Sequence, residues 1–142
     1  MELIHLIYCS AITADELSKQ ELDVILDQSR INNDQAEITG MLLYDSGSFF
    51  QVLEGDQKMV EAVYEKIVKD TRHQNVTKLI MEPIEERAFG HWSMGYPRVT
   101  KKELTEIEGL NDFFVSGKSF MQLEQGRAKT LLNAFQQGKW RV

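Results

Sequence analysis

The sequence is short of cysteine, of clustered histidine and of long apolar runs, and each shortage excludes a class of protein. Cys9 is the single cysteine among 142 residues, so the chain forms no internal disulfide and no cysteine-based metal site. The three histidines are scattered, and none has a partner at metal-ligand spacing. No apolar run reaches the roughly 18 residues of a membrane-spanning helix. The N-terminal residues also lack the features of a signal peptide, so we expect a cytoplasmic protein without a metal.

Standard catalytic signatures are also missing. The sequence has no nucleophile elbow, no phosphate-binding glycine loop, no zinc-protease motif and no dinucleotide-binding glycine fingerprint. Its net charge of -6 is uneven, because residues 1–100 contain 9 Lys and Arg against 17 Asp and Glu, whereas residues 101–142 contain 7 against 5. Such an acidic body lacks the clustered cations from which nucleic-acid binding draws most of its affinity.

The hydrophobic pattern predicts an α+β domain. Strands are expected over 3–9, 38–44, 48–53, 76–84 and 92–99. The first helix is expected to begin at the Thr-x-x-Glu capping box of 13–16 and to fade near Asn32-Asn33, and Asp56 is expected to cap the second. The order β-α-β-β-α-β-β contains the ferredoxin-like unit, an antiparallel-containing sheet with two helices on one face.

The last forty residues predict a helical appendage, so we expect a domain over 1–100 and an appendage over 101–142. Capping boxes begin at Thr100 and Ser119, and the second is expected to open a helix with apolar residues at Leu123, Leu131, Leu132 and Phe135. The large apolar residues of the appendage are Phe113, Phe114, Phe120 and Trp140. Two roles are open to them: covering the second face of the sheet, which we favour, or forming a surface for self-association or a partner.

Strand alternation places two polar side chains in the predicted interior. Tyr8 on the first strand and Gln51 on the hairpin strand are expected side by side, facing a helix stripe of Ile25, Ser29 and Asn33. Burying such groups unpaired costs about 1–3 kcal/mol each. Either they satisfy one another, or a polar planar ligand lies between the helices. The alternative is ordinary structure: a core tyrosine with its hydroxyl in water, a glutamine on a solvated face and asparagines that end a helix.

Local sequences favour the ligand. In chain order they are Leu6-Ile7-Tyr8-Cys9-Ser10, Asn32-Asn33, Ile38-Thr39-Gly40-Met41-Leu42, Phe50-Gln51-Val52-Leu53-Glu54-Gly55, Asp70-Thr71-Arg72-His73 and Trp92-Ser93-Met94. Together they resemble the BLUF family of flavin-binding blue-light sensors over about residues 1–100. The chain length is also similar to that of short BLUF proteins, which carry a sensor and a brief helical tail.

The resemblance implies a fold that holds FAD, with FMN or riboflavin sometimes substituting, between the two helices. It implies that Tyr8 donates an electron and a proton after light absorption, and that the Gln51 carboxamide then rotates or tautomerises. Trp92 and Met94 are the candidates that relay this change to the tail. The implied cofactor-binding residues are Ile25, Ser29, Asn32, Asn33, Phe49, Gln51, Lys66, Ile67, Asp70, Arg72 and His73. At the position of Lys66 several family members have arginine. Lysine lacks the planar guanidinium with which arginine makes two parallel hydrogen bonds, so that bidentate contact is not expected here.

The same resemblance implies a photoreceptor without turnover that regulates another signalling protein and often forms homo-oligomers. Two alternatives share the fold. An acylphosphatase-like small enzyme would need a phosphate loop after the first strand, where residues 9–13 read Cys-Ser-Ala-Ile-Thr. A regulatory dimer that binds another metabolite would leave the joint presence of Tyr8, Gln51 and Trp92 unexplained. Colour separates the three, because only the photoreceptor is expected to purify yellow.

Overall fold

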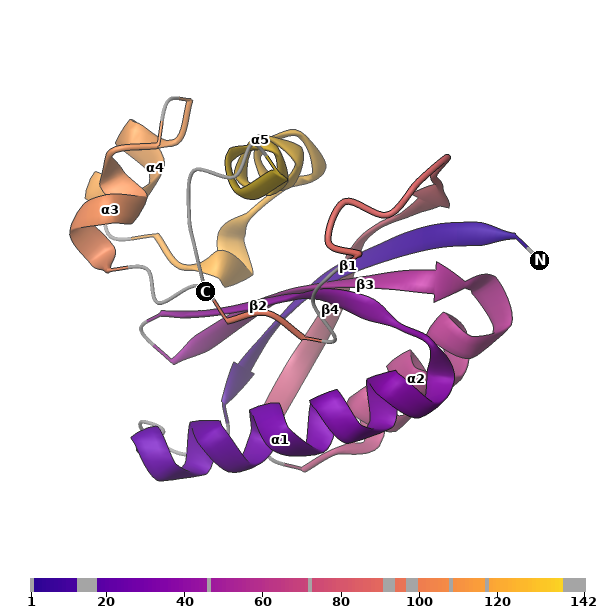
Figure 1. The fold of residues 1–142 in the computed structure, drawn as a ribbon. Coiled ribbons are helices and arrows are strands. Elements are labelled where there is room, and N and C mark those ends of the chain that lie inside the picture. The colour runs from indigo at the N-terminus through magenta and orange to yellow at the C-terminus, as the bar shows by residue number, and fades with distance from the viewer. Residues whose placement is uncertain are drawn as a thin grey trace.

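A four-stranded antiparallel sheet forms the centre of the protein, with helices on both of its faces (Figure 1). The computed structural model describes residues 2–12, 18–45, 47–71, 73–90, 94–96, 100–107, 109–116 and 118–136. The strand order is β2-β3-β1-β4, with β1 (Leu3–Ile12) and β3 (Ser48–Asp56) central and β2 (Thr39–Asp45) and β4 (His73–Pro83) at the edges. The predicted ferredoxin-like α+β arrangement and its two central strands are confirmed.

Helices α1 (Lys19–Ala36) and α2 (Gln57–Lys69) cover one face of the sheet (Figure 1). The capping box that begins α1 is formed by Ser18 and Glu21: the Ser18 Oγ accepts from the Glu21 N–H at 3.1 Å, and the Glu21 carboxylate accepts from the Ser18 N–H at 3.2 Å. The box predicted over 13–16 lies outside the described residues. Asp56 precedes α2 as predicted, although its side chain makes no capping hydrogen bond.

The end of α1 lies further along the chain than predicted. The helix continues through Asn32 and Asn33 to Ala36. It stops because Glu37 adopts the left-handed conformation, with φ of 55°, and its N–H reaches back to the Asn33 and Asp34 carbonyls. Asn33 therefore lies inside the last turns of the helix, with its side chain held on a fixed helical face.

Short helices of the C-terminal segment cover the other face of the sheet (Figure 1). They are α3 (Lys101–Thr105), α4 (Asn111–Val115), the 3-10 turn η1 (Phe120–Gln122) and α5 (Gln125–Gln136). The capping box at Thr100 is confirmed. The box at Ser119 caps only η1, which corrects the prediction of a longer helix there. Leu123 has an extended backbone, with ψ of 140°, so the helix cannot continue past it.

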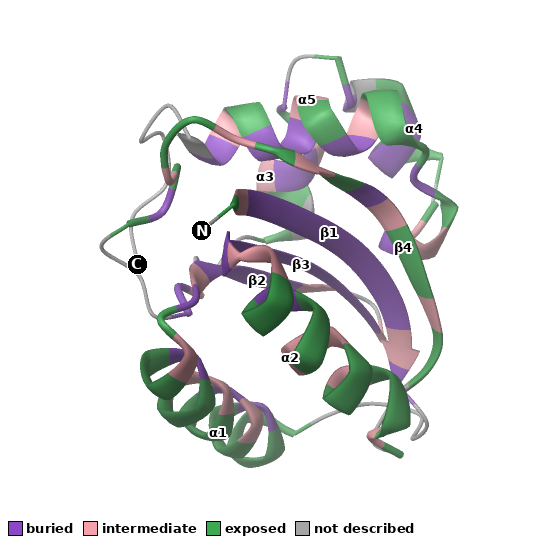
Figure 2. Cartoon of the chain, turned by 90° about the vertical axis from the view of Figure 1, so that its right-hand side faces the viewer, coloured by how far each residue is buried: buried purple, intermediate pink, exposed green. Residues whose placement is uncertain are grey.

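Two separate apolar cores lie on the two faces of the sheet. Alternation along β1 sends Leu6 and Tyr8 toward α1 and α2, whereas Ile7 and Cys9 join the core beneath the C-terminal segment. Figure 2 shows β1 buried along nearly all its length, with α1 and α2 exposed on their outer sides. The aromatic residues Phe113, Phe114 and Phe120 are all buried in the second core. Their predicted role as a cover for that face is confirmed, and Trp140 lies outside the described residues.

A short segment, 94–96, runs beside the edge strand β2. The Gly95 N–H donates to the Gly40 carbonyl at 3.0 Å, and the Leu42 N–H donates to the Gly95 carbonyl at 2.8 Å. These bonds make one isolated parallel bridge, between Met41 and Gly95, and the rest of the strand predicted over 92–99 lies outside the described residues. Gly40 has no room for a side chain, because a Cβ there would lie 1.8 Å from the Val52 carbonyl oxygen.

Within the described part of the chain, none of the helices combines the length and the hydropathy needed to cross a membrane.

Candidate functional site

A pocket opens between α1 and α2, with the sheet as its floor. Its lining residues are Tyr8, Ile25, Gln28, Ser29, Asn32, Asn33, Leu42, Phe49, Gln51, Leu53, Val63, Lys66, Ile67 and Asp70. Most of the lining surface is apolar, and a few polar groups lie on the floor and along the rim. This combination is typical of a site that holds a flat, largely apolar ligand with polar edges.

The floor of the pocket contains a buried hydrogen bond between Tyr8 and Gln51. The two residues are direct cross-strand partners in the β1–β3 pair, and both are at least 95% buried. The Tyr8 hydroxyl donates to the Gln51 carboxamide oxygen. Burial raises the pKa of the Tyr8 phenol far above its ordinary value, and nearby Tyr64 and Asp70 raise it further. The phenol therefore remains protonated at neutral pH and serves as the donor.

The carboxamide nitrogen of Gln51 has a second partner in Met94. Its Nε2 donates to the Met94 Sδ at 3.3 Å, and Met94 is 99% buried. Of the two residues between which the sequence could not choose, Met94 faces the site, and Trp92 lies outside the described residues. A carboxamide offers two N–H donors and two acceptor lone pairs. Contacts with Tyr8 and Met94 use one of each, and these are the partners of the carboxamide within the described part of the chain, so donor and acceptor capacity is left toward the pocket.

Helix α1 supplies one wall of the pocket. Ile25, Ser29 and Asn33 follow one another at four-residue spacing along its inner face, as predicted, and all three line the pocket. Asn33 is buried, whereas Asn32 is exposed and lies at the rim. An amide side chain on this wall can pair with the carbonyl and N–H edge of a heterocycle.

Helix α2 supplies the opposite wall. Ile67 and Val63 are half-buried apolar residues, Lys66 is exposed and Asp70 is half-buried, and all four line the pocket. Ile25 on α1 and Ile67 on α2 thus stand on opposite walls, as the predicted sandwich of a flat ring requires. Arg72 lies outside the described residues.

Phe49 and His73 are the two remaining candidates. Phe49 lines the pocket, two residues before Gln51 on β3. The backbone of His73 begins β4, but its side chain lies outside the described part of the structure.

Sequence reasoning does not assign four of the lining residues. They are Gln28, Leu42, Leu53 and Val63. Leu42 is the cross-strand partner of Gln51 in the β2–β3 pair, and Leu53 shares the face of Gln51, so strand alternation carries a signal for both. Gln28 lies one helical turn before Asn32, which places it on the same side of α1.

A further aromatic residue contacts the site from α2. The Tyr64 ring lies edge-on to the Tyr8 ring, with centroids 5.7 Å apart, and the Lys78 ammonium lies 5.5 Å from the Tyr64 centroid. Tyr64 thus packs between the ring of Tyr8 and the side chain of Lys78 on β4. Among the residues that the structure describes, no group of three or more acidic, histidine or cysteine side chains is placed to hold a metal ion.

The chain that forms this pocket is similar in sequence to known proteins. A sequence model described as "BLUF: Sensors of blue-light using FAD" matches residues 3–95. The chain is 37% identical over 124 residues to the photoactivated adenylate cyclase subunit alpha of Euglena gracilis, covering 87% of this chain and 12% of that protein. It is 34% identical over 121 residues to the blue light- and temperature-regulated antirepressor BluF of Escherichia coli (strain K12), covering 85% and 29%. The chain therefore spans about an eighth of the first relative and less than a third of the second.

A solved structure matches the whole fold. The structure titled "BlsA photo-activated state" superposes with a TM-score of 0.79 at 32% identity, covering 99% of both chains. The likeness therefore extends beyond the sheet and its two helices to the C-terminal segment.

Proposed function

This chain belongs to the BLUF family, the sensors of blue light that use FAD, and from that premise we propose how its own residues hold the flavin and pass on the signal. The family senses blue light with a flavin, and we propose that this chain does so without turning over a substrate. The chain of hydrogen bonds from Tyr8 through Gln51 to Met94, on the floor of the pocket, is the observation that carries the proposal.

The pocket fits an isoalloxazine ring. Ile25 and Ile67 on opposite walls provide the flat apolar contacts that the two ring faces need. The buried carboxamide of Gln51 retains donor and acceptor capacity toward the pocket, and among the residues that the structure describes its partners are Tyr8 and Met94. Asn33 holds the polar edge of the ring, with Asn32 beside it at the rim, while Ser29 and Phe49 complete the binding wall.

The charged residues of the pocket wall suit the ribityl and phosphate part of the cofactor. Lys66 would supply a positive charge to it, and Asp70 would supply an acceptor for hydroxyl groups. We assign Arg72 and His73 to the same part of the cofactor from the resemblance, since they follow Asp70 by two and three positions in the chain. FAD is the expected cofactor, and FMN or riboflavin would fit the same ring site because all three carry the same ring.

The response to light centres on Gln51. When bound, the flavin supplies the absorption of blue light and an excited state that accepts an electron. Tyr8 would be the donor of the electron and the proton, and its hydroxyl already donates a hydrogen bond to the Gln51 oxygen. If the carboxamide rotates, its nitrogen and oxygen exchange places and the Met94 sulfur loses its N–H donor. If it tautomerises instead, one hydrogen moves from the nitrogen to the oxygen, and the donors toward Tyr8 and Met94 change without an exchange of atoms. In either case the change reaches the segment 94–96.

Output is assigned to the C-terminal part of the chain. We divide the chain into a sensor over 1–100 and an appendage over 101–142, because Met94 lies just ahead of α3. The relatives named above include a photoactivated adenylate cyclase and a light-regulated antirepressor, so different activities are regulated by light within the family. For this chain we propose a cytoplasmic homo-oligomer that regulates a separate signalling protein.

Flavin content tests the proposal. Protein purified in darkness and then denatured should release about one flavin per chain, identified by chromatography. An acylphosphatase-like enzyme or a dimer for a colourless metabolite would release none, and it would also fail to take up added FAD.

A further inference from the structure

Segment 94–96 is attached to the rest of the protein from two sides. On the strand side, Gly95 exchanges backbone hydrogen bonds with Gly40 and Leu42 of β2. On the helix side, the Arg30 guanidinium Nε donates to the Met94 carbonyl at 3.1 Å. These contacts hold the backbone of Met94 between the edge of the sheet and α1.

Arg30 comes from the helix that forms a wall of the flavin pocket. It directly follows Ser29, and it lies one turn before Asn33. Its other charged neighbour is Asp27, whose carboxylate oxygen is 4.0 Å away on a side chain that is 73% exposed. An exposed pair at that distance holds a side chain weakly. The shorter contact of Arg30 is therefore the one with the Met94 carbonyl.

The Met94 thioether depends on this attachment for its place beside Gln51. A thioether sulfur is a weak hydrogen-bond acceptor, so its contact with the Gln51 nitrogen does little to hold the segment by itself. A hydrogen bond from a guanidinium is roughly twice as strong as one between neutral groups. Fixing the Met94 carbonyl fixes the direction in which its side chain leaves the backbone.

We propose that Arg30 is a positioning residue for the light response, which ties the flavin-binding helix to the Met94 segment and keeps the Met94 sulfur against Gln51. The role in the light response rests on the proposed function. The attachment itself, the hydrogen bond from Arg30 to the Met94 carbonyl, does not depend on light. Without Arg30, the carboxamide of Gln51 still changes on illumination, whereas segment 94–96 no longer follows it.

Hydrogen exchange in the dark tests the attachment without any photochemistry. Arg30→Met keeps an unbranched side chain of high helix propensity and removes the donor. We expect the Gly95 and Leu42 amide protons to exchange at least about tenfold faster in this variant. The amide of Ile38, which bonds the Asn33 carbonyl at 2.8 Å, should remain as protected as in the wild type and so reports that α1 is intact. Arg30→Lys, which restores a cationic donor, should return exchange toward the wild-type rate.

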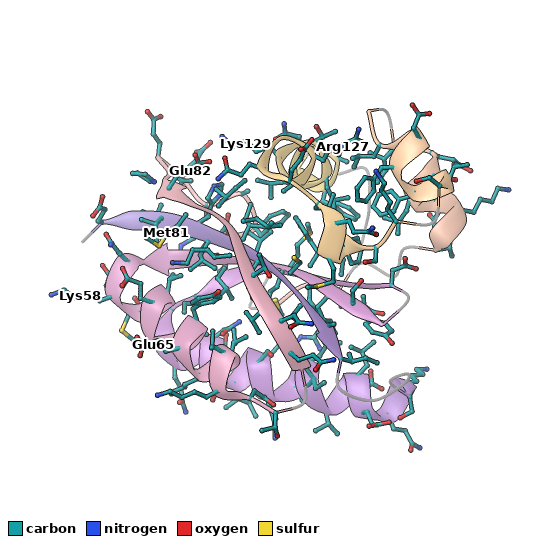
Figure 3. The ribbon with its side chains drawn as sticks, turned by 180° about the vertical axis from the view of Figure 1, so that it is seen from behind. Lys58, Glu65, Met81, Glu82, Arg127 and Lys129 are labelled. Atoms are coloured by element: carbon teal, nitrogen blue, oxygen red, sulfur yellow. The ribbon has the colours of Figure 1, made fainter. Side chains whose placement is uncertain are left out.

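Two matched controls separate the attachment from general effects. Arg127→Met removes an arginine of equal exposure, 40% against 41%, whose guanidinium also pairs with a carboxylate three residues earlier. Arg127 lies on α5, on the other side of the sheet from α1 (Figure 3). Asp27→Asn removes the surface partner of Arg30 and leaves the Met94 contact in place. Neither control should change exchange at Gly95 or Leu42.

The Met94 methyl resonance in methyl-labelled protein gives the second readout, recorded with bound flavin in darkness and under blue light. The wild type should show a light-dependent shift of this resonance. Arg30→Met should lose at least half of that shift and keep the change in the flavin absorption spectrum. Wild-type exchange rates at both amides in Arg30→Met, or the same acceleration in either control, would overturn the proposal. If the dark exchange rates change as expected but neither the wild type nor any variant responds to light, the proposed function is wrong, whereas the attachment of segment 94–96 by Arg30 is supported.

Discussion

The Tyr8 hydroxyl donates a hydrogen bond to the carboxamide oxygen of Gln51, its direct cross-strand partner in the β1–β3 pair. The nitrogen of the same carboxamide donates to the Met94 sulfur. One planar group thus links a central strand to the segment that leads to the C-terminal helices. The carboxamide oxygen contacts Tyr8 and the nitrogen contacts Met94, so exchanging the two atoms alters both contacts at once. This is a switch that needs no large movement of the backbone.

Removing the Tyr8 hydroxyl should abolish the light response and spare flavin binding. Tyr8→Phe keeps the ring that packs against Tyr64 and deletes the donor to Gln51. We expect flavin content within about twofold of the wild type and no red shift in the light-minus-dark spectrum. Tyr44→Phe, on the edge strand β2, is the control and should keep the shift. An unchanged shift in Tyr8→Phe would refute the donor role.

Removing the Gln51 carboxamide should fix the protein in one state. Gln51→Ala removes the Tyr8–Gln51 hydrogen bond, and loss of such a bond costs about 0.5–1.5 kcal/mol in the free energy of unfolding. Flavin should still bind between the helices, and dark and illuminated spectra should be identical. Gln57→Ala removes a glutamine whose side chain makes an exposed hydrogen bond to Glu61 and does not line the pocket, and it should respond to light normally. A full shift in Gln51→Ala would place the switch elsewhere.

Asn33 should matter for flavin retention more than for folding. Its side chain lines the pocket, whereas its backbone carbonyl makes the bonds that end α1, and Asn33→Ala keeps the backbone. Loss of one or two hydrogen bonds to the ligand should weaken flavin binding about tenfold or more, measured by titration of the flavin-free protein. The thermal midpoint of that flavin-free protein should change little. Gln35→Ala, exposed on the same helix, is the control, and equal affinities of the two variants would remove Asn33 from the site.

The ion pair between the sheet and α5 should weaken in acid. A hydrogen bond from the His5 ring at 2.9 Å lowers the pKa of the Glu82 carboxyl below its usual 4.5, and the Lys129 ammonium of α5, 3.4 Å away, lowers it further (Figure 3). A lowered pKa means that the stabilisation is complete above pH 4.5 and is lost as the pH falls through the lower folded-state value.

Glu82→Gln should therefore reduce stability at pH 7 and converge with the wild type near pH 3. Because Glu82 is partly exposed, the difference at pH 7 should be about 0.2–1 kcal/mol. Urea unfolding at both pH values measures it. Glu86→Gln, on the exposed turn after β4, should show no such pH-dependent difference; an equal one would mean that the His5 and Lys129 contacts contribute nothing.

Strand alternation accounts for most of what the sequence predicts about the site. Side chains in a strand point to opposite faces in turn, so placing Tyr8 and Gln51 on one face required only the strand assignments. The same rule sent Cys9 to the other core. Helical spacing likewise brought Ile25, Ser29 and Asn33 to one wall. These inferences succeed because they rest on local geometry that tertiary packing does not change.

Helix ends were harder to predict because several local signals compete. Asn32-Asn33 is typical of a helix end, yet α1 continues until Glu37 turns left-handed. The capping box at Ser119 is real but opens only a 3-10 turn, because the extended Leu123 follows. A capping motif therefore indicates where a helix begins and says little about its length.

Hydrophobic spacing alone did not predict the contacts of the segments after β4, and the resemblance named Trp92 and Met94 without a choice between them. Met94 reaches Gln51 across 43 positions. The buried Glu54 carboxylate accepts from the Ala88 and Phe89 amides at 2.6 and 3.0 Å, and this contact fixes the turn that precedes segment 94–96. No periodicity connects such positions, since their proximity results from the folded sheet.

The most direct test of the central claim is the absorption spectrum of the purified protein, recorded in darkness and again under blue light. The account predicts a flavin spectrum that shifts slightly to the red on illumination, without bleaching, and returns in the dark. The Gln51 switch explains such a shift by a stronger hydrogen bond to the ring carbonyl while the flavin stays oxidised. A flavin spectrum that bleaches, or a protein that neither contains nor takes up flavin, would contradict it.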